Sequence, residues 1–187
     1  MSQLHDYLAF FAATDALKET RRACWIYSGR RHETVAEHVW HATLLALLMR
    51  DLLPGGIEPN HVRNLLIVHD LVEVYAGDTS VWDETGAVGV EDRELAAGER
   101  LMALLPPESG VFRRIDALWR EFQDQESPAA QLARAIDSLH PMINSWAPRA
   151  QGHPMPLTPE SYESSRKRVP LDRFAVTSQV SRWLVVN

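Results

Sequence analysis

The residues of this chain best suited to chemistry lie in a short apolar run, where His69 and Asp70 stand side by side. Glu73 follows Asp70 by three residues, so in a helix its carboxylate lies one turn along on the same face. Polar groups buried without partners destabilise a fold by about 1–3 kcal/mol each. A divalent first-row metal ion would satisfy them, since neutral imidazole and carboxylate are good ligands for such ions. The alternative is a helix with one buried, hydrogen-bonded histidine.

Two further residues could complete a metal site. His38 lies in the first turns of an expected helix, and Asp137 lies in the apolar segment 135–139. Each alone is more often a solvated or hydrogen-bonded side chain. With His69 and Asp70, however, they form a set of two imidazoles and two carboxylates on three helices, which the core of a helical bundle can bring together. We therefore expect these four residues to bind a metal ion.

Apolar periodicity predicts an all-α, single-domain bundle of seven or eight helices without sustained strands. Helix starts are indicated by the capping-box pattern of Thr34 and Glu37 and by first-turn prolines. Loops are expected at residues 19–33, 78–89 and 147–157, the last of which could cover a pocket. One domain would span residues 1–187, with a metal-binding core at about 20–146 and a C-terminal loop and helices at 147–187. Helices are expected at about residues 3–18, 34–52, 58–77, 90–105, 108–123, 128–146, from 158, and 171–185.

Composition excludes several classes of protein. The net charge of −6 gives no basic field for a nucleic acid polymer or an anionic membrane. No apolar run approaches the roughly 18–20 residues of a membrane span. The single cysteine, Cys24, excludes an internal disulfide. We therefore expect a cytoplasmic protein.

Taken in order, these motifs resemble the HD-domain metal-dependent phosphohydrolases, and within them the 5'-deoxynucleotidase branch. The resemblance implies an HD-domain helical bundle with His38, His69, Asp70 and Asp137 as metal ligands. It implies hydrolysis of deoxynucleoside 5'-monophosphates to deoxynucleoside and phosphate by attack of a metal-activated water. The matching segments, within about residues 8–146, are 22–25, 33–38, 69–73 with 77–78, 118–122 and 135–137.

The ligand number constrains the expected metal. Four protein ligands would fill a tetrahedral zinc site and leave no open position, as in structural zinc sites. A six-coordinate ion with the same four ligands keeps two positions for water or substrate. We therefore expect one divalent transition metal ion: Mn, Fe, Co, Ni or a flexibly coordinated Zn.

The resemblance also implies roles for residues around the metal. It implies that Glu73 is the general acid or base and that Asp78 positions or protonates the leaving group; the alternatives are a solvated helix-face carboxylate and a plain turn residue. Arg22 resembles a phosphate-binding arginine, whose planar fork suits bidentate contact with phosphate oxygens. Trp25 could pack over the sugar or the base.

Other histidines and partners are less defined. His41, one turn beyond His38, could reach the same site. A small-molecule nucleotide is the expected partner, and a homodimer through the last helix, for example Trp183, is a further expectation. Two other functions stay open: hydrolysis of another small phosphate ester, such as a nucleoside triphosphate or cyclic nucleotide, and a non-catalytic metal- or nucleotide-binding regulatory module. Loop or surface positions are expected for His5, His32, His61, His140 and His153.

Overall fold

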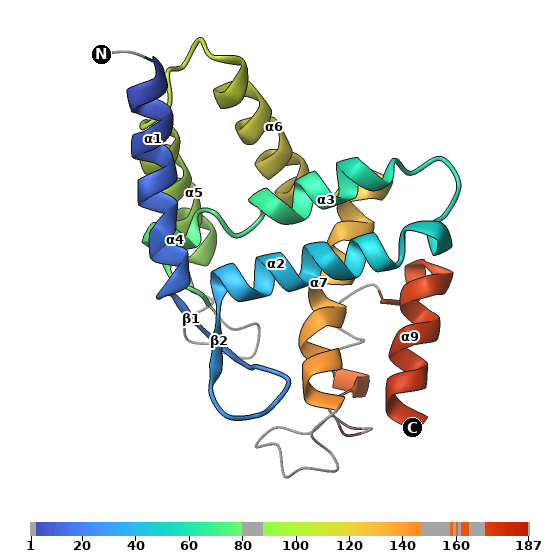
Figure 1. The fold of residues 1–187 in the computed structure, drawn as a ribbon. Helices are drawn as coiled ribbons and strands as arrows, with labels where there is room; N and C mark the ends of the chain where they lie inside the picture. The colour runs from blue at the N-terminus through green and yellow to red at the C-terminus, as the bar shows by residue number, and fades with distance from the viewer. Residues whose placement is uncertain are drawn as a thin grey trace.

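The computed structural model describes residues 3–79, 88–146, 158, 160, 162–164 and 171–186, and most of them are helical (Figure 1). This confirms the predicted all-α class. Short helical turns lie at Asp15–Lys18, Arg50–Leu52, Glu73–Ala76 (α4) and Leu171–Arg173. The longer helices are α1 (Gln3–Thr14), α2 (Val35–Leu48), α3 (Pro59–Val68), α5 (Val90–Met102), α6 (Gly110–Asp124), α7 (Pro128–Trp146) and α9 (Ala175–Val186).

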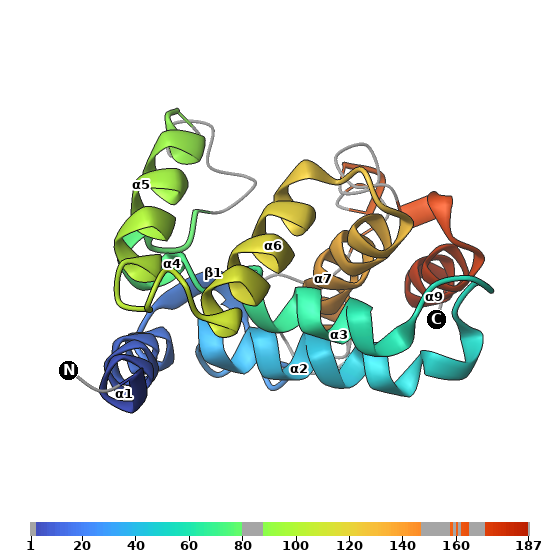
Figure 2. The same ribbon diagram turned by 90° about the horizontal axis from the view of Figure 1, so that it is seen from above.

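Helices α2, α3 and α7 form the centre of the fold. Helix α3 lies along α2, and α7 crosses both (Figure 1). Seen from above, α6, α7 and α9 stand in a row against the α2–α3 pair (Figure 2). The side chains at these crossings are almost fully buried, among them Ala42 of α2, Leu65 of α3 and Ile136 of α7. The three central helices are also the ones predicted to carry the metal ligands.

Residues 19–33, predicted to be a loop, contain a β-hairpin. Strands β1 (Arg21–Trp25) and β2 (His32–Thr34) pair antiparallel, with Arg21 opposite Thr34 and Trp25 opposite His32. Along β1, Arg22 is less exposed than its two neighbours. The prediction was wrong because a charged side chain occupies the inner position, so the apolar alternation that marks a strand is absent.

The helix predicted at 58–77 is interrupted at the His69–Asp70 doublet. Helix α3 ends at Val68, and the backbone then forms a tight turn in which Glu73 N donates to Asp70 O. Hydrogen bonds between residues three apart place their side chains one above the other. Asp70 and Glu73 therefore still share a face, although the helix is not continuous.

The capping box predicted at Thr34 is present. The Thr34 hydroxyl accepts from Glu37 N at 3.3 Å, and the Glu37 carboxylate accepts from Thr34 N at 2.9 Å. Because these bonds fix where β2 ends and α2 begins, they set the positions of Glu33, just before the cap, and His38, one turn into α2.

Three predictions concern segments that the structure describes only in part or not at all. Of the loop predicted at 78–89, residues 80–87 lie outside the described residues. The loop at 147–157, including His153, and most of the helix predicted from 158 lie outside the described residues. Within the described part of the chain, no helix combines the length and apolar character needed to cross a membrane.

Candidate metal and phosphate site

The four predicted metal ligands lie together where α2, α7 and the end of α3 meet. His38 Nε2 is 2.9 Å from Asp137 Oδ1 and 3.8 Å from Asp70 Oδ2. His69 Nε2 is 3.0 Å from Asp70 Oδ2 and 3.6 Å from Asp137 Oδ1. Both imidazoles are buried, at 0% and 2% exposure. Atoms of His38, His69 and Asp137 lie within 4.8 Å of one another, a spacing that could hold one metal ion.

The hydrogen bonding of His69 fits a cation at this position. Its Nδ1 lies 2.7 Å from the Leu66 carbonyl oxygen, so Nδ1 carries a hydrogen and donates it. In the neutral ring, Nε2 then holds a lone pair that faces the oxygens of Asp70 and Asp137. Nε2 is buried and has no hydrogen-bond partner. A lone pair directed at two carboxylates is unfavourable, so the site favours a proton or a metal ion between Nε2 and the carboxylate oxygens.

The electrostatics of the cluster point the same way. Burial lowers the pKa of His69, but the carboxylates of Asp70 and Asp137 outweigh burial and raise it. Burial raises the pKa of Asp137, but contacts with His38 and His69 outweigh it and hold the pKa well below its usual value. The cluster therefore attracts positive charge.

Arg22 extends from β1 to the edge of this cluster. Its Nη1 lies 3.1 Å from Asp70 Oδ2 and 3.2 Å from Asp78 Oδ1, and its Nε lies 3.3 Å from Glu33 Oε1. Burial lowers the pKa of Arg22, but the nearby carboxylates, Asp70 first, outweigh it and raise the pKa above its usual value. The structure therefore places a permanent positive charge beside the predicted ligands. Trp25 lies at the far end of β1, with its ring centroid 4.3 Å from that of His32.

Glu73 and Asp78 are both held close to the cluster. Glu73 is 9% exposed, so it is not the solvated carboxylate of the alternative interpretation. Burial, and then the charges of Asp70 and Asp78, raise its pKa to about 9 against the opposing effect of Arg22. Asp78 is more than a turn residue, because it also accepts from Ala23 N at 3.3 Å.

His140 corrects the prediction of a loop or surface position. It is 2% exposed and lies on α7, three residues after Asp137. Its Nδ1 is 3.0 Å from His38 Nδ1, and its Nε2 is 3.0 Å from His41 Nδ1. His41 thus lies near the site, as expected, but through His140. The spacing of His140 from Asp137 on the apolar face of α7 was the signal that could have identified it.

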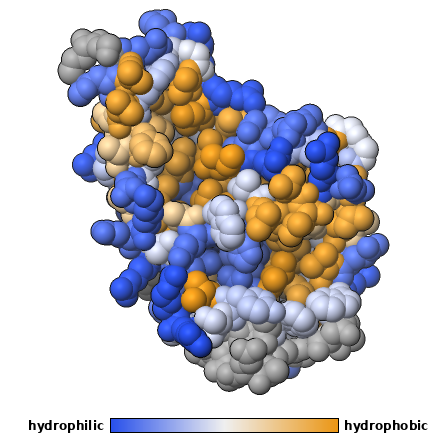
Figure 3. Space-filling model, in the orientation of Figure 1, coloured by the Kyte–Doolittle hydropathy of each residue, from blue (hydrophilic) through white to orange (hydrophobic). Residues whose placement is uncertain are grey.

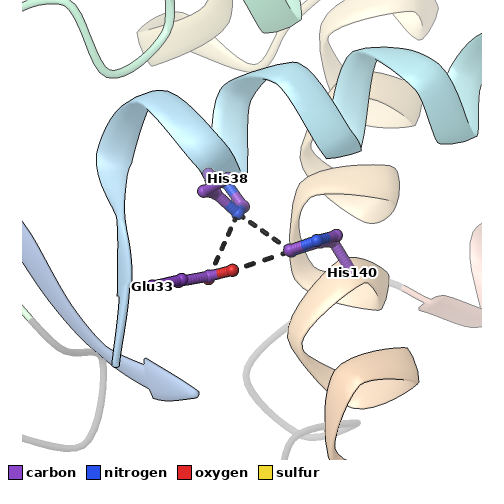
Figure 4. A group of neighbouring side chains, drawn as sticks. All are labelled: Glu33, His38 and His140. Atoms are coloured by element: carbon purple, nitrogen blue, oxygen red, sulfur yellow. Dashed lines mark hydrogen bonds and ion pairs between the residues drawn. The ribbon is translucent and has the colours of Figure 1, made fainter. Parts of the chain in front are cut away.

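Glu33 is a second site residue that sequence reasoning did not single out. It is 2% exposed, and its carboxylate points toward His38 and His140 (Figure 4). Its Oε1 also lies 3.3 Å from Arg22 Nε. Its Oε1 is 3.7 Å from His38 Nδ1 and 3.9 Å from His140 Nδ1. Burial raises the pKa of Glu33 to about 7, although Arg22 opposes the shift.

The remaining histidines of the described chain lie elsewhere. His61 of α3 is partly exposed, in line with the expected surface position. Its Nε2 also lies 2.8 Å from a carboxylate oxygen of Glu121. His5 is exposed on α1 and His32 lies in the hairpin.

Comparison with known proteins decides the family. A sequence model described as the HD domain matches residues 14–169. The chain belongs to the HD domain family. This confirms the family predicted from the ordered histidine and aspartate motifs.

Relatives within the family carry a common name. A zebrafish (Danio rerio) protein named 5'-deoxynucleotidase HDDC2 is 28% identical over 76% of this chain and 69% of its own length. A Dictyostelium discoideum protein of the same name is 23% identical over 80% of this chain and 81% of its own length.

Solved structures share the fold. A protein from Magnetospirillum magnetotacticum, described as a predicted metal-dependent phosphohydrolase, superposes with a TM-score of 0.83 at 29% identity, covering 98% of this chain and 91% of that chain. A Pyrococcus horikoshii protein superposes with a TM-score of 0.69 at 23% identity, covering 94% of this chain and 98% of that chain, which supports the fold alone.

Proposed function

We propose that this HD-domain protein is a metal-dependent 5'-deoxynucleotidase that hydrolyses deoxynucleoside 5'-monophosphates to deoxynucleoside and phosphate. The observation that carries the proposal is the position of His69 Nε2, which forms no hydrogen bond and lies 3.0 Å from Asp70 Oδ2 and 3.6 Å from Asp137 Oδ1. The buried charge of Arg22 lies beside them. The names of the HDDC2 relatives support the reaction and the substrate class.

In this proposal His38, His69, Asp70 and Asp137 hold one divalent transition metal ion, which is Mn, Fe, Co, Ni or Zn. When bound, such an ion supplies a Lewis acid that draws electron density from the phosphoryl group and makes a water acidic enough to attack near neutral pH. Imidazole and carboxylate together suit these metals.

Arg22 binds the phosphate of the substrate. Its Nη1 pairs with Asp70 and Asp78, so the guanidinium is already directed toward the ligand cluster. Its Nε faces Glu33, which keeps the guanidinium plane in place while Nη1 contacts a phosphate oxygen. Trp25, three residues along the hairpin, packs against the sugar or the base.

Glu73 and Asp78 move the protons of the reaction. Glu73 takes the proton of the attacking water, and Asp78 positions and protonates the departing 5'-oxygen, so the products are a hydroxyl group and inorganic phosphate. Burial raises the pKa of Glu73 to about 9, so the carboxyl group is protonated near neutral pH in the metal-free protein. The positive charge of a bound metal ion would lower this pKa, and Glu73 could then act as the base.

A substrate panel tests this function. The protein, loaded in turn with Mn²⁺, Co²⁺ and Zn²⁺, is incubated with deoxynucleoside and ribonucleoside monophosphates, a nucleoside triphosphate and a cyclic nucleotide, and the products are identified. We expect phosphate and deoxynucleoside from the deoxy monophosphates. Release of triphosphate, or opening of the cyclic ester alone, would favour another phosphohydrolase. Tight nucleotide binding without a product would favour a regulatory module.

We also propose that residues 1–187 form a single HD domain that acts as a homodimer in the cytoplasm. Trp183 of α9 is 51% exposed, although its neighbour Leu184 is buried. Larger groups of hydrophobic side chains lie over α1 and along α2 (Figure 3). On α2, Trp40 is 66% and Leu48 is 72% exposed. Exposed apolar patches commonly mark association surfaces.

Light scattering of wild type and Leu48→Lys tests the dimer. A wild-type mass of one chain would contradict it.

A further inference from the structure

The hydrogen bonds around His38 extend away from the proposed metal. Helix α2 presents His38 and His41 three residues apart on one face, and His140 of α7 inserts between them (Figure 4 shows the inner pair). The two contacts are each 3.0 Å, nitrogen to nitrogen. The rings meet edge to face, at 69° and 76°. Three imidazoles from two helices therefore form a continuous chain that ends at His38.

The hydrogen bonds along these three imidazoles can run in either of two directions. A neutral imidazole has one N–H and one acceptor nitrogen, so each contact needs a donor on one side only. In the outward direction, His38 Nδ1–H donates to His140 and His140 Nε2–H donates to His41. In the inward direction both bonds reverse, and His38 Nε2–H donates to Asp137, 2.9 Å away.

Only the outward direction leaves His38 able to bind a metal through Nε2. A metal-binding histidine normally donates its other ring N–H to an acceptor that fixes the tautomer and the ring orientation. Glu33 does not serve as that acceptor: its Oε1 is 3.7 Å from His38 Nδ1, beyond hydrogen-bond length, and its Oε2 accepts from Asn144 at 3.2 Å. His140 is the acceptor within reach.

We propose that His140, supported by His41, is a positioning residue that holds His38 as the Nδ1–H tautomer and so directs its Nε2 lone pair to the metal. This inference rests on the proposed role of His38 as a ligand. It adds two residues outside the predicted ligand set, and it predicts that metal binding reverses the direction of the whole imidazole chain.

Metal affinity of matched variants tests the proposal. The dissociation constant for Zn²⁺ is measured by competition with a chelator for wild type, His140→Leu, His140→Asn and His41→Leu. His140→Leu removes the acceptor, and we expect it to weaken binding about 10- to 100-fold. In His140→Asn, the amide oxygen can take the place of Nδ1, so binding should stay close to wild type. His41→Leu should have a smaller effect than His140→Leu.

Two controls separate positioning from general damage to the core. Leu139→Ala removes a fully buried side chain next to His140 on α7 and leaves the three imidazoles unaltered. It should therefore lower stability and leave the Zn²⁺ affinity of the folded protein unchanged. Circular dichroism checks that each variant is folded. Equal losses in His140→Leu, His140→Asn and Leu139→Ala would overturn the proposal.

Nitrogen NMR of the zinc-loaded protein provides a direct readout of the tautomers. We expect His38 as Nδ1–H and His140 as Nε2–H, with the reverse in the metal-free protein. His140 found as Nδ1–H in the loaded protein would overturn the inference while leaving the proposed function standing. Two ions per chain, one of them lost in His140→Asn, would instead place an ion between Glu33, His38 and His140. A wild type that binds no metal would overturn both proposals.

Discussion

His69 and Asp70 are neighbours in the chain, but they are fixed by different partners. His69 Nδ1 donates to the Leu66 carbonyl, one turn back in α3, and Asp70 pairs with Arg22 from the hairpin. The first contact is local, so the sequence around His69 already contained the reason for its orientation. The second joins residues 48 positions apart. At the residue scale, the chemistry could be predicted, but the contacts that hold it in place could not.

The residues that were missed show the same limit. Glu33 and His140 are buried because β2 and α7 meet at the site. Glu33 opens the matching segment 33–38, but nothing in the sequence assigned it a role there. For His140, the three-residue spacing from Asp137 was the one local signal, while the neighbouring Ser138 and Pro141 gave no sign of burial. His38, Asp137 and the His69–Asp70 doublet were predicted to converge, and the structure brings them together.

Replacing Glu73 by glutamine should remove the proton-transfer group and keep the shape of the side chain. We expect kcat for deoxynucleoside monophosphates to fall by about 10²- to 10⁴-fold, the usual contribution of a general acid or base. Metal content should be unchanged, because Glu73 is outside the proposed ligand set. Steady-state kinetics with metal analysis of the same sample tests this. Full activity in Glu73→Gln would exclude the proposed role.

The same substitution should change how stability depends on pH in the metal-free protein. The pKa of Glu73 is raised to about 9 in the fold from an ordinary value of 4.5. Below pH 4.5 both folded and unfolded chains are protonated at Glu73; as the pH rises toward 9, the unfolded chain loses the proton first, so wild-type stability falls. Glu73→Gln lacks this loss.

Urea unfolding at pH 5 and pH 8 provides the measurement. Because one pKa unit corresponds to about 1.4 kcal/mol, Glu73→Gln should gain at least about 1 kcal/mol over wild type between the two pH values. If the free energies of unfolding of wild type and Glu73→Gln differ by the same amount at pH 5 and at pH 8, burial does not keep Glu73 protonated.

At the scale of elements, turns decide where the site residues lie. The end of α4 is a case in point: Gly77 has φ 73° and ψ 162°, a region of backbone space that is essentially restricted to glycine. The next residue, Asp78, contacts both Ala23 N and Arg22. Gly77 therefore sets the direction in which the chain delivers Asp78 to the hairpin.

Substituting Gly77 with alanine should strain this backbone by about 1–3 kcal/mol or shift Asp78 away from the hairpin. We expect lower stability in urea and a reduced kcat. Gly55→Ala is the matched control, because Gly55 has no atoms within 4 Å of an added Cβ and its φ is not positive. Equal behaviour of the two variants would contradict the role given to Gly77.

Helices were predicted more reliably than the hairpin, for a physical reason. The capping box at Thr34 and the first-turn Pro59 are local signals that act through nearby backbone groups. Strands β1 and β2 are stabilised by pairing with each other and by the ion pairs of Arg22, which no local pattern reveals.

At the scale of the whole molecule, the negative charge of the metal-free protein repels an anionic substrate. The protein carries a net charge of −6, and carboxylates surround Arg22 at the site. A phosphate would meet these carboxylates before it gains the full attraction of the guanidinium. The fold therefore needs additional positive charge to bind an anionic substrate.

Calorimetry with inorganic phosphate tests this coupling. We expect measurable binding to the Mn²⁺-loaded protein and at least about tenfold weaker binding to the metal-free protein, in line with coupling energies of 1–3 kcal/mol between linked sites. Equal phosphate affinity in both forms would mean that Arg22 alone carries the anion.

The order of the motifs was enough to predict the family, and the match of the HD domain model to residues 14–169 confirms it. Association between chains could not be predicted in this way. The proposed association rests on exposed surfaces such as the face of α2 that carries Leu48, and the sequence does not distinguish an exposed leucine from a buried one.

Counting metal ions tests the central claim most directly. Elemental analysis is made on wild type, Asp70→Ala and the control Asp116→Ala, whose carboxylate pairs with Arg120 on the surface of α6. We predict about one transition metal ion per chain in wild type and in the control, and its loss in Asp70→Ala with the helical fold retained. A wild type free of metal after reconstitution with Mn²⁺, Co²⁺ and Zn²⁺, or full metal content in Asp70→Ala, would contradict the proposed site.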